Sequence, residues 1–282
     1  MSVAATLSGK AQVAGVVGWP VSHSRSPRLH GYWIAEHGLD AAYVPLPVAP
    51  ESLEVAVHGL AAAGFAGVNL TIPHKEQALA LCDEVDAVAR RIGAVNLLVF
   101  SGGAIRGSNT DAFGFMANLA ATAPVWSAAA PVLLLGAGGA ARAVAVGLLD
   151  AGVSELRLCN RSRARAERLA DELGGAIDVV PWEDRAAALA GAGLVVNSTS
   201  LGMTGQPPLD LPLDDLAAEA TVCDLVYSPL ETPLLAAARA RGCTGVDGLG
   251  MLLHQARPCF AAWFGPDPQV TEALRRFVLG DG

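Results

Sequence analysis

The chain has 282 residues, of which 52% are hydrophobic and 16% are charged, and it carries a formal net charge of −8. This composition is typical of a compact α/β protein with room for two domains and a sizeable core. The acidic charge is spread out without a basic stripe, so a nucleic-acid partner is not expected. Because no uncharged apolar run reaches the roughly 18 residues of a membrane span, no membrane partner is expected either.

The five cysteines, at positions 82, 159, 223, 243 and 259, show neither a C-x-x-C pair nor the spacing of a zinc site. A scattered, odd-numbered set in an enzyme-sized chain indicates reduced thiols, a cytoplasmic location and no metal. Residues 1–17 lack a charged start followed by a continuous apolar core, so a signal peptide is not expected.

The first elements expected along the chain are a loose leader at 1–10, a strand at 12–18, a polar loop at 19–27 and a helix at 28–37. Pro27 lies where that helix can begin. Ser24 and Ser26 therefore lie next to a helix N-terminus. Each could be an ordinary cap, but two hydroxyls beside free N–H groups could also bind a carboxylate.

The next elements expected are a strand at 42–48, a helix at 51–62 and a strand at 67–72. The last of these strands ends in polar residues, Asn69 and Thr71, and Pro73 is expected to open a helix. Lys75 would then lie in the first turn of that helix, where a cation opposes the helix dipole. A solvated surface lysine is the simpler interpretation, but the disfavoured position favours a functional role.

A helix at 84–92, a strand at 94–100, a hairpin turn at 101–104 and, after the stretch 106–114, a helix through about 121 are expected next. Asn96 would lie within an apolar strand, where asparagine is disfavoured. It is either a hydrogen-bonded core residue or a ligand contact. Asp111 stands at the start of the following helix, where capping is the simplest role.

The most informative stretch, residues 131–141, reads Pro-Val-Leu-Leu-Leu-Gly-Ala-Gly-Gly-Ala-Ala. It predicts a buried strand, a tight glycine turn and the start of a helix at 139–151. The pattern Gly136-x-Gly138-x-x-Ala141 fits the dinucleotide fingerprint, in which the backbone approaches a pyrophosphate at a helix N-terminus. On its own this is a weak signal, because methyltransferases and flavoproteins have similar turns.

The next strand, expected at 155–159, runs into Asn160-Arg161-Ser162-Arg163-Ala164-Arg165. An NAD enzyme would carry an acid here to bind the ribose 2′-hydroxyl, about 20 residues past the fingerprint. The acid is missing, and three arginines stand in its place. Guanidinium groups bind phosphate in a bidentate manner, which favours NADP over NAD. The alternative is a basic helix start, which is unfavourable without an anion.

The remaining elements expected are strands at 176–180, 193–197 and 221–226, helices at 182–190 and 231–241, and a long helix that opens in the stretch 245–255 and runs to about 264. Strand–helix alternation of this kind predicts a doubly wound parallel sheet. Thr199 follows a strand at the ligand edge of such a sheet, where either a cofactor contact or an ordinary turn is expected. If the last helix packs on the first domain, the cofactor domain is an insertion. His254 on that helix is treated as a surface or core histidine.

Seven short motifs occur in order along the chain: Gly18-x-Pro20 through Ser24-x-Ser26-Pro27, Asn69-x-Thr71-Ile72-Pro73-His74-Lys75, Gly93-Ala94-Val95-Asn96, Asn109-Thr110-Asp111, Gly136-Ala137-Gly138-Gly139-Ala140, Asn160-Arg161-Ser162, and Asp247-Gly248-Leu249-Gly250-Met251 with Gln255. Each is weak alone. In this order and at this spacing, from about residue 12 to 270, they closely resemble the shikimate dehydrogenase family.

The resemblance implies reversible, NADP-linked reduction of 3-dehydroshikimate to shikimate, a step of chorismate and aromatic amino acid biosynthesis. It also implies an α/β fold with an N-terminal substrate domain (1–110 and 248–282) and an inserted Rossmann-type doubly wound parallel sheet (111–247). By family position, the catalytic pair is Lys75 and Asp111. The residues implied for substrate binding are Ser24, Ser26, Asn69, Thr71, Lys75, Asn96, Asp111, Tyr227 and Gln255.

The residues predicted for NADP, from the glycine turn, the strand edge and the resemblance together, are Gly136, Ala137, Gly138, Gly139, Ala140, Asn160, Arg161, Ser162, Arg165, Thr199, Leu225, Gly248 and Met251. The chain departs from the family pattern at Ser108, where Asp is common, and at Leu97, where Thr is common. The alternatives are a quinate/shikimate dehydrogenase, often NAD-linked, and a non-catalytic NADP-responsive regulator. Monomer and homodimer both stay open.

Overall fold

The computed structural model describes residues 6–280, so part of the predicted leader, residues 1–5, lies outside the described residues. The chain divides into two compact units, Met1–Thr110 with Gln255–Gly282 (unit 1) and Asp111–His254 (unit 2). Unit 2 is one continuous segment, whereas unit 1 is built from both ends of the chain. None of the described helices has the length and apolar character needed to cross a membrane.

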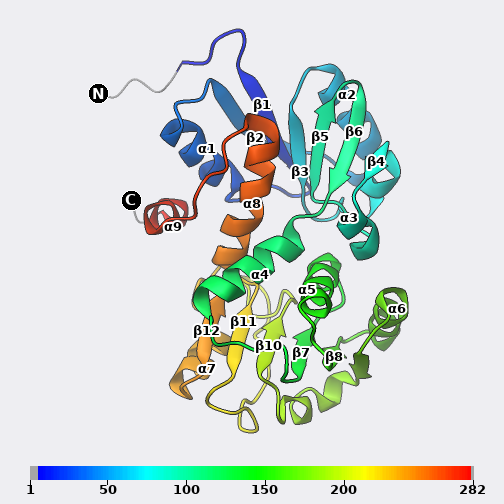
Figure 1. Cartoon of the computed structure of the whole chain (residues 1–282), viewed down its shortest axis with the longest axis vertical. Helices are drawn as coiled ribbons and strands as arrows, with labels where there is room; N and C mark the ends of the chain where they lie inside the picture. Colours follow the sequence, from blue (N-terminus) through cyan, green and yellow to red (C-terminus); the bar gives the residue numbers. More distant parts are fainter. Residues whose placement is uncertain (1–5, 281–282) are drawn as a thin grey trace. The chain divides into compact units, whose positions relative to one another are not determined.

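Unit 1 contains a mixed six-stranded sheet (Figure 1). Its strands are β1 (Gln12–Gly18), β2 (Ala41–Pro47), β3 (Gly67–Leu70), β4 (Glu84–Val85), β5 (Leu97–Ser101) and β6 (Ala104–Ser108), in the order β2-β1-β3-β5-β6-β4. Strand β1 pairs in parallel with β2 and β3, while β5 is antiparallel to β3 and β6. The carboxyl ends of β1 and β3 therefore lie side by side.

The helical segments of unit 1 are α1 (Ser26–Glu36), η1 (Pro50–Ser52), α2 (Leu53–Ala62), η2 (Gln77–Leu81), α3 (Ala87–Ile92) and α9 (Glu272–Leu279), and α8 (Gly248–Phe264) ends in it. Helix α2 buries Leu53 and Val57 against one face of the sheet, beside Val68. On α8, the Trp263 indole donates to the carbonyl of Leu98 at 3.0 Å. A Cβ atom at Gly67 would overlap that indole, so glycine allows α8 to approach β3.

Strand β2 forms one edge of this sheet. The amide of Val48 donates to the carbonyl of Gly18 on β1, so the even-numbered residues of β2 direct their N–H groups toward β1. Pro45 and Pro47 are odd-numbered, so their backbone nitrogens face away from β1, on the outer edge of the sheet. Because proline has no N–H, this edge offers few donors to another strand.

Unit 2 contains a six-stranded, all-parallel sheet. Its strands are β7 (Val132–Leu135), β8 (Leu156–Cys159), β9 (Ile177–Val180), β10 (Leu194–Asn197), β11 (Thr221–Asp224) and β12 (Thr244–Asp247), in the order β12-β11-β10-β7-β8-β9. The chain builds outward from β7 to β9, and β10 then returns to the other side of β7. This reversal creates a switch point between β7 and β10, and the predicted doubly wound parallel sheet is confirmed.

The helical segments of unit 2 are α4 (Asp111–Thr122), α5 (Gly139–Asp150), α6 (Arg163–Leu173), η3 (Trp182–Asp184), η4 (Ala187–Leu189) and α7 (Pro233–Ala240). Alternate strand residues enter two separate apolar clusters. Leu134 packs with Val144 of α5, and its neighbour Leu133 packs in the other cluster with Leu235 of α7. The unit therefore has a core on each face of its sheet, as a layered α/β domain requires.

Two expectations in the first third were wrong. No helix opens at Pro73: the Lys75 carbonyl accepts from the amide of Val95 at 2.8 Å, so a tertiary bond replaces a helical one, and η2 begins only at Gln77. Asn96 also stands just before β5 rather than within a strand.

Three further boundaries differ from the sequence interpretation. Residues 84–92 split into β4 and α3, because the Asp86 carboxylate accepts from the amide of Ala89 and starts the helix there. Residues 182–190 form two 3₁₀ turns, η3 and η4, closed by bonds to residues three positions earlier. Strand β12, within a glycine-rich stretch, was not predicted.

Candidate active site and cofactor site

The predicted substrate residues of unit 1 begin where β1 and β3 end. The amide of Thr71 donates to the Val17 carbonyl at 2.9 Å, and the amide of Trp19 donates to the Ile72 carbonyl at 3.1 Å. Thr71, the residue that follows β3, therefore lies beside the carboxyl end of β1. A Cβ atom on Gly18 would collide with the Thr71 methyl group, so the glycine permits this approach.

Ser24 and Ser26 lie at the start of α1, as expected. Helix α1 begins at Ser26 itself, and the residue at the N-cap position is Arg25, whose side chain makes no capping bond. Instead, the Arg25 guanidinium donates to the Val278 carbonyl at 3.0 Å. The Ser24 hydroxyl accepts from the amide of Ser26 at 3.3 Å. Neither serine is therefore a conventional N-cap.

Lys75 lies on a turn that tertiary hydrogen bonds hold. Besides the Val95 bond to its carbonyl, the preceding His74 ring donates through Nε2 to the carbonyl of Val48 at 2.9 Å. Burial lowers the pKa of His74, which keeps the ring neutral. Because Lys75 is outside a regular helix, the argument from the helix dipole is wrong for it. His74 is an anchor that sequence reasoning missed, although it adjoins the lysine.

Asn69, Asn96 and Gln255 come together within unit 1 in one buried polar network. Asn69 donates to the Asn96 carbonyl at 2.9 Å. Asn96 in turn donates to the side-chain oxygens of Thr110 and Gln255, each at 3.0 Å. Thr110 and Gln255 are the residues at which the two segments of unit 1 end and resume, so Asn96 ties the two segments together.

Asp111 and Tyr227 belong to unit 2. Asp111 is the first residue of α4 and is buried, with 4% of its surface exposed. Tyr227 follows β11 and is half-buried.

The glycine turn of unit 2 has the form that a dinucleotide requires. Gly136 has a φ of 113°, which favours glycine, and its amide donates to the Cys159 carbonyl at 2.8 Å. Gly138 is the N-cap of α5 and supplies no side-chain cap. A Cβ atom on Gly138 or Gly139 would meet nothing within 4 Å, so space is open in front of the helix N-terminus. Ala137 lies within the turn, and Ala140 lies in the first turn of α5.

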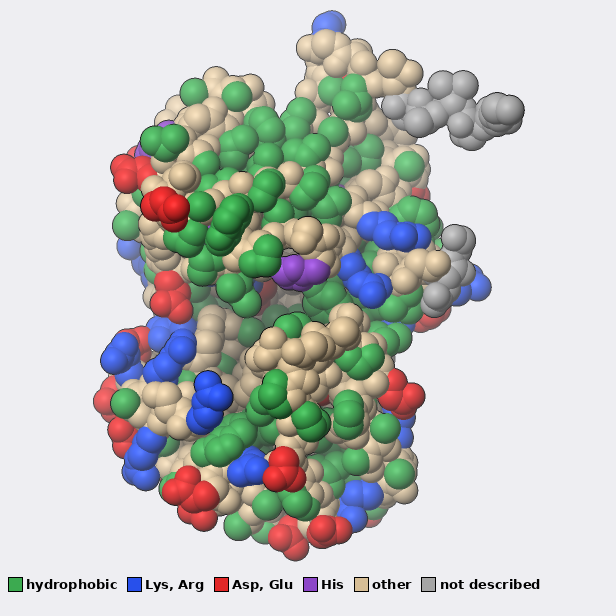
Figure 2. All heavy atoms as spheres, turned by 180° about the vertical axis from the view of Figure 1, so that it is seen from behind, with side chains coloured by type: hydrophobic (Ala, Val, Ile, Leu, Met, Phe, Trp, Pro, Cys, Tyr) green, Lys and Arg blue, Asp and Glu red, His purple; other side chains and the backbone are tan. Residues whose placement is uncertain are grey.

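The arginines at the end of β8 differ in their partners. Arg163 pairs with Glu167 on the same helix at 2.8 Å. Arg161 and Arg165 are exposed and, among the described residues, have no carboxylate partner. Asn160 donates to the Ser162 carbonyl at 2.8 Å and shapes the loop. Figure 2 shows Lys and Arg side chains gathered on unit 2 in the region of α6.

Thr199 lies on the other side of the switch point, after β10. Its hydroxyl donates to Asn197 Oδ1 at 2.7 Å, and Asn197 donates to Asp224 at 2.9 Å. Burial raises the pKa of Asp224, which also accepts from Thr232. The sequence did not single out this Asn197–Asp224 pair, which ties the ends of β10 and β11 together.

Gly248, Leu225 and Met251 lie where β11, β12 and α8 meet. A Cβ atom on Gly248 would overlap the Leu225 carbonyl, so glycine is required for this close approach. Asp247 Oδ1 accepts from the amide of Leu249 at 3.1 Å and caps the start of α8. Met251 is partly buried against the unit 2 core.

Residues 16–98 match the family described as shikimate dehydrogenase substrate binding domain, and residues 119–203 match the family described as shikimate / quinate 5-dehydrogenase. The chain is 59% identical over 280 residues to the shikimate dehydrogenase (NADP(+)) of Rhodospirillum rubrum, covering 97% of this chain and 99% of that protein. The chain belongs to the shikimate dehydrogenase family.

Solved structures of shikimate dehydrogenase relatives share the whole fold. The shikimate 5-dehydrogenase of Thermus thermophilus, in complex with NADP(H) and shikimate, is 39% identical with a TM-score of 0.85, covering 94% of this chain and 99% of that chain. The quinate dehydrogenase of Corynebacterium glutamicum, in complex with NAD, is 33% identical with a TM-score of 0.90, covering 96% and 99%. The two-domain α/β fold predicted from the sequence is therefore confirmed.

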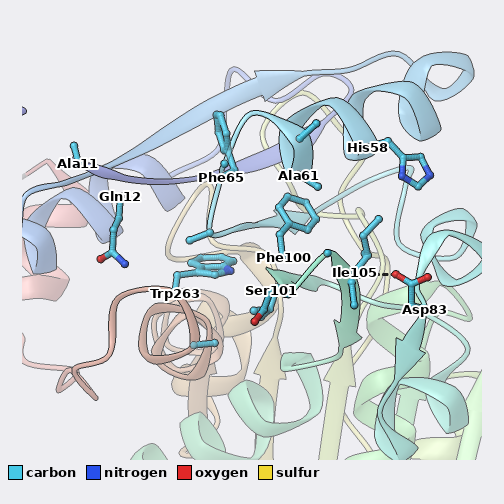
Figure 3. A pocket seen from close by; sticks show the side chains of 18 of the residues that line it. Ala11, Gln12, His58, Ala61, Phe65, Asp83, Phe100, Ser101, Ile105 and Trp263 are labelled. Carbon is cyan, nitrogen blue, oxygen red and sulfur yellow. Dashed lines mark hydrogen bonds between the residues drawn. The ribbon is translucent and has the colours of Figure 1, made fainter. Parts of the chain in front are cut away.

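A hollow of about 920 Å³ opens elsewhere on unit 1, at the amino end of β1 (Figure 3). Phe65, Phe100 and Trp263 stand near its middle, and His58 and Asp83 lie at one side. No residue predicted for substrate or cofactor lines it. The predicted substrate residues that follow β1 and β3 lie at the opposite, carboxyl end of β1, so the hollow is separate from them.

Proposed function

We propose that the chain catalyses the reversible, NADPH-dependent reduction of 3-dehydroshikimate to shikimate, a step of aromatic amino acid biosynthesis. The observation that carries this proposal is the 59% identity over 97% of the chain with a shikimate dehydrogenase (NADP(+)). The substrate domain is taken as residues 1–110 with 248–282, and the NADP domain as residues 111–247.

The cofactor role of unit 2 is supported by its open glycine turn and by two arginines. The exposed backbone of Gly138 and Gly139 leaves room for a pyrophosphate at the N-terminus of α5. Arg161 and Arg165, which have no protein carboxylate among the described residues, would hold the 2′-phosphate, with Asn160 and Ser162 alongside. When bound, NADPH supplies the hydride.

The protein itself must supply one proton during reduction and accept it in the reverse direction. During reduction, negative charge develops on the ring oxygen of the substrate. We assign Lys75 Nζ as the group that stabilises this charge and gives the oxygen its proton, acting as general acid. In the reverse direction the same amine accepts the proton. Asp111 is assigned to orient Lys75 and a ring hydroxyl.

The remaining assignments follow the chemistry of the substrate, a hydroxylated ring carrying a carboxylate. Ser24 and Ser26, with the N-terminus of α1, would bind the carboxylate. Thr71, Asn96, Tyr227 and Gln255 would contact the ring hydroxyls, and Asn69 would orient the groups around them. Thr199, Leu225, Gly248 and Met251 would line the cofactor.

A quinate dehydrogenase is the second candidate, because the Corynebacterium glutamicum enzyme shares the whole fold. One experiment separates the two: absorbance at about 340 nm is followed with shikimate or quinate, each with NADP⁺ or NAD⁺. We expect the fastest reduction with shikimate and NADP⁺. A preference for quinate would transfer the assignment to the second candidate, and no change with either acid would leave the non-catalytic regulator.

We propose a cytoplasmic location, which is supported by the five cysteines, since none of them forms a disulfide. Sedimentation at micromolar concentration would distinguish a monomer from a homodimer.

A further inference from the structure

Two backbone groups determine how the buried amides of unit 1 are oriented. The amide N–H of Thr110 donates to Asn96 Oδ1 at 2.8 Å. Since a backbone N–H can only donate, the oxygen of Asn96 must face Thr110. Asn96 Nδ2 then donates to Gln255 Oε1 at 3.0 Å. Gln255 therefore directs its oxygen into the network, and its NH₂ group, which makes no protein hydrogen bond among the described residues, is left to donate elsewhere.

The same logic orients Asn69. Its Nδ2 donates to the Asn96 carbonyl at 2.9 Å and to Cys259 Sγ at 3.2 Å, which uses both amide hydrogens. A carbonyl can only accept, so Asn69 Oδ1 must face the other way. There it accepts from the Tyr43 hydroxyl at 2.7 Å. With both of its hydrogens committed to the protein, Asn69 is built to hold the backbone of Asn96.

Tyr43 is held firmly at the far end of this network. It lies on β2 with 8% of its surface exposed, and its ring stacks on His30 at 4.0 Å between centroids. Burial raises the pKa of Tyr43 well above its usual value, so the phenol keeps its proton. That proton goes to Asn69, so the Tyr43 hydroxyl contacts a side chain assigned to the substrate site.

We propose that Tyr43 is a positioning residue for substrate binding, whose hydroxyl acts through Asn69 and Asn96 to hold Gln255 with its NH₂ group presented as a donor to a substrate oxygen. This inference rests on the proposed function. It makes the amide of Gln255 a donor of fixed polarity, which selects a hydroxyl or carboxylate oxygen as its partner. Tyr43 itself does not touch the substrate.

The test is Tyr43→Phe, which removes one oxygen atom and keeps the stacked ring. Tyr32→Phe, on α1 of the same unit, is the matched control, because the Tyr32 hydroxyl has no protein partner among the described residues. We expect kcat/KM for shikimate to fall about 10-fold in Tyr43→Phe, mainly through KM, which is the size of one lost buried hydrogen bond. KM for NADP⁺ is expected to stay unchanged. A purely structural role would lower the melting temperature and leave KM for shikimate as in Tyr32→Phe, which would overturn the proposal.

A double-mutant cycle with Gln255→Ala tests the route of the effect. If Tyr43 acts through Gln255, the same Tyr43→Phe change in the Gln255→Ala background should alter shikimate affinity, measured by calorimetry, less than about 3-fold. A larger change there would overturn the proposal. The wild type is assayed first with shikimate and NADP⁺. An inactive wild type would overturn the proposed function, whereas an active wild type with an unaltered Tyr43→Phe variant would overturn this inference alone.

Discussion

Lys75 stands on a turn whose backbone is held by hydrogen bonds that do not involve its amine. The backbone of this turn is held by the Val95 amide, and the ring of the adjacent His74 bonds the Val48 carbonyl. Lys75→Ala therefore should remove the acid without moving its surroundings. We expect kcat to fall by ~10²-fold or more, the usual scale of general acid catalysis, with KM for shikimate within a few-fold.

Steady-state kinetics of Lys75→Ala in both directions provide the measurement. Lys10→Ala is the control, since Lys10 is the other lysine of the chain and lies at the separate hollow. A loss confined to KM would make Lys75 a binding residue.

We expect Arg161 to decide between the two nicotinamide cofactors. Its guanidinium is exposed and has no carboxylate partner among the described residues, so a bound 2′-phosphate is the natural counter-ion. Arg161→Asp should raise KM for NADPH by about 10- to 100-fold, the worth of a hydrogen bond to a charged group, and barely change KM for NADH. Arg168→Asp, an equal charge change on α6, should leave both KM values nearly unchanged. Equal losses with both cofactors in Arg161→Asp would contradict this role.

At the residue scale, the sequence was most informative where one residue type has one chemical use. The glycines at 136, 138 and 139 and the arginines at 161 and 165 could be singled out because turn geometry and phosphate binding restrict the choice, and their role in binding NADP stays a prediction. Tyr43 gave no such signal, since its partner Asn69 lies 26 positions away and either residue alone is ordinary in a core. Contacts formed only by tertiary folding leave no local pattern.

Helix α1 packs on the rest of unit 1 through an aromatic cluster around His30. The rings of Trp33, Tyr43, Phe260 and Trp263 lie 4.0–5.9 Å from the His30 ring. Both ring nitrogens are buried without a hydrogen-bond partner. Burial lowers the pKa of His30 from 6.5 to about 3.

This histidine should make the stability of the protein depend on pH. Below pH 6.5, the ordinary pKa of histidine, the unfolded chain binds a proton at His30. The folded chain does not bind this proton until about pH 3. The free energy of unfolding should therefore fall as pH drops through this window, by about 1.4 kcal/mol per unit from this residue. In the wild type, the free energy of unfolding should differ between pH 7 and pH 4.5, and His30→Phe should reduce that difference by about 2–3 kcal/mol.

Urea unfolding of wild type and His30→Phe at both pH values gives the measurement. His58→Phe changes an exposed histidine of α2, and its free energy of unfolding should depend on pH as in the wild type. At pH 7 the His30→Phe variant should be no less stable, because an unpartnered ring is replaced by an apolar one. If the free energy of unfolding of His30→Phe changes with pH as much as that of the wild type, the burial of His30 does not cause the pH dependence.

At the element scale, apolar patterns predicted most helices and strands and failed where such a pattern is missing. Helices α4 and α5 were expected, because their apolar faces repeat and their starts are marked by Asp111 and by the glycine turn. Strand β4 is only two residues long, and β12 (Thr244–Asp247) lies in a glycine-rich stretch without an apolar run. The turn at Lys75 was mistaken for a helix because its Val95 bond comes from a distant segment.

Unit 2 is continuous in sequence and has a core on each face of its sheet. It also contains every residue assigned to NADP. A fragment of residues 111–254 should therefore fold alone and bind NADP⁺. At ligand concentrations of 100 times Kd, binding should stabilise the fragment by about 2.7 kcal/mol. Calorimetry with and without NADP⁺ checks this, and the same fragment carrying Arg161→Asp should lose the effect.

Unit 1, unlike unit 2, is built from two segments that are distant in the sequence and come together only when the chain folds. Thr110 and Gln255 lie close together, with their side-chain oxygens 3.3 Å apart. A short glycine linker should therefore be able to join them in place of unit 2, and we expect the shortened chain to bind shikimate without oxidising it. The family resemblance implied this junction at 110 and 248, but no local sequence signal marks it, since it joins positions 145 residues apart.

The prolines at the free edge of β2 also bear on how copies of this chain meet in a crowded cell. An exposed strand edge normally invites another copy to add a strand, which is a route to fibrils and to irreversible loss of enzyme. Pro45 and Pro47 remove two of the backbone donors that such strand addition needs, at the edge of the sheet that β2 forms. High expression of the chain should therefore be tolerated without edge-to-edge aggregation, and any self-association measured in solution should use another surface.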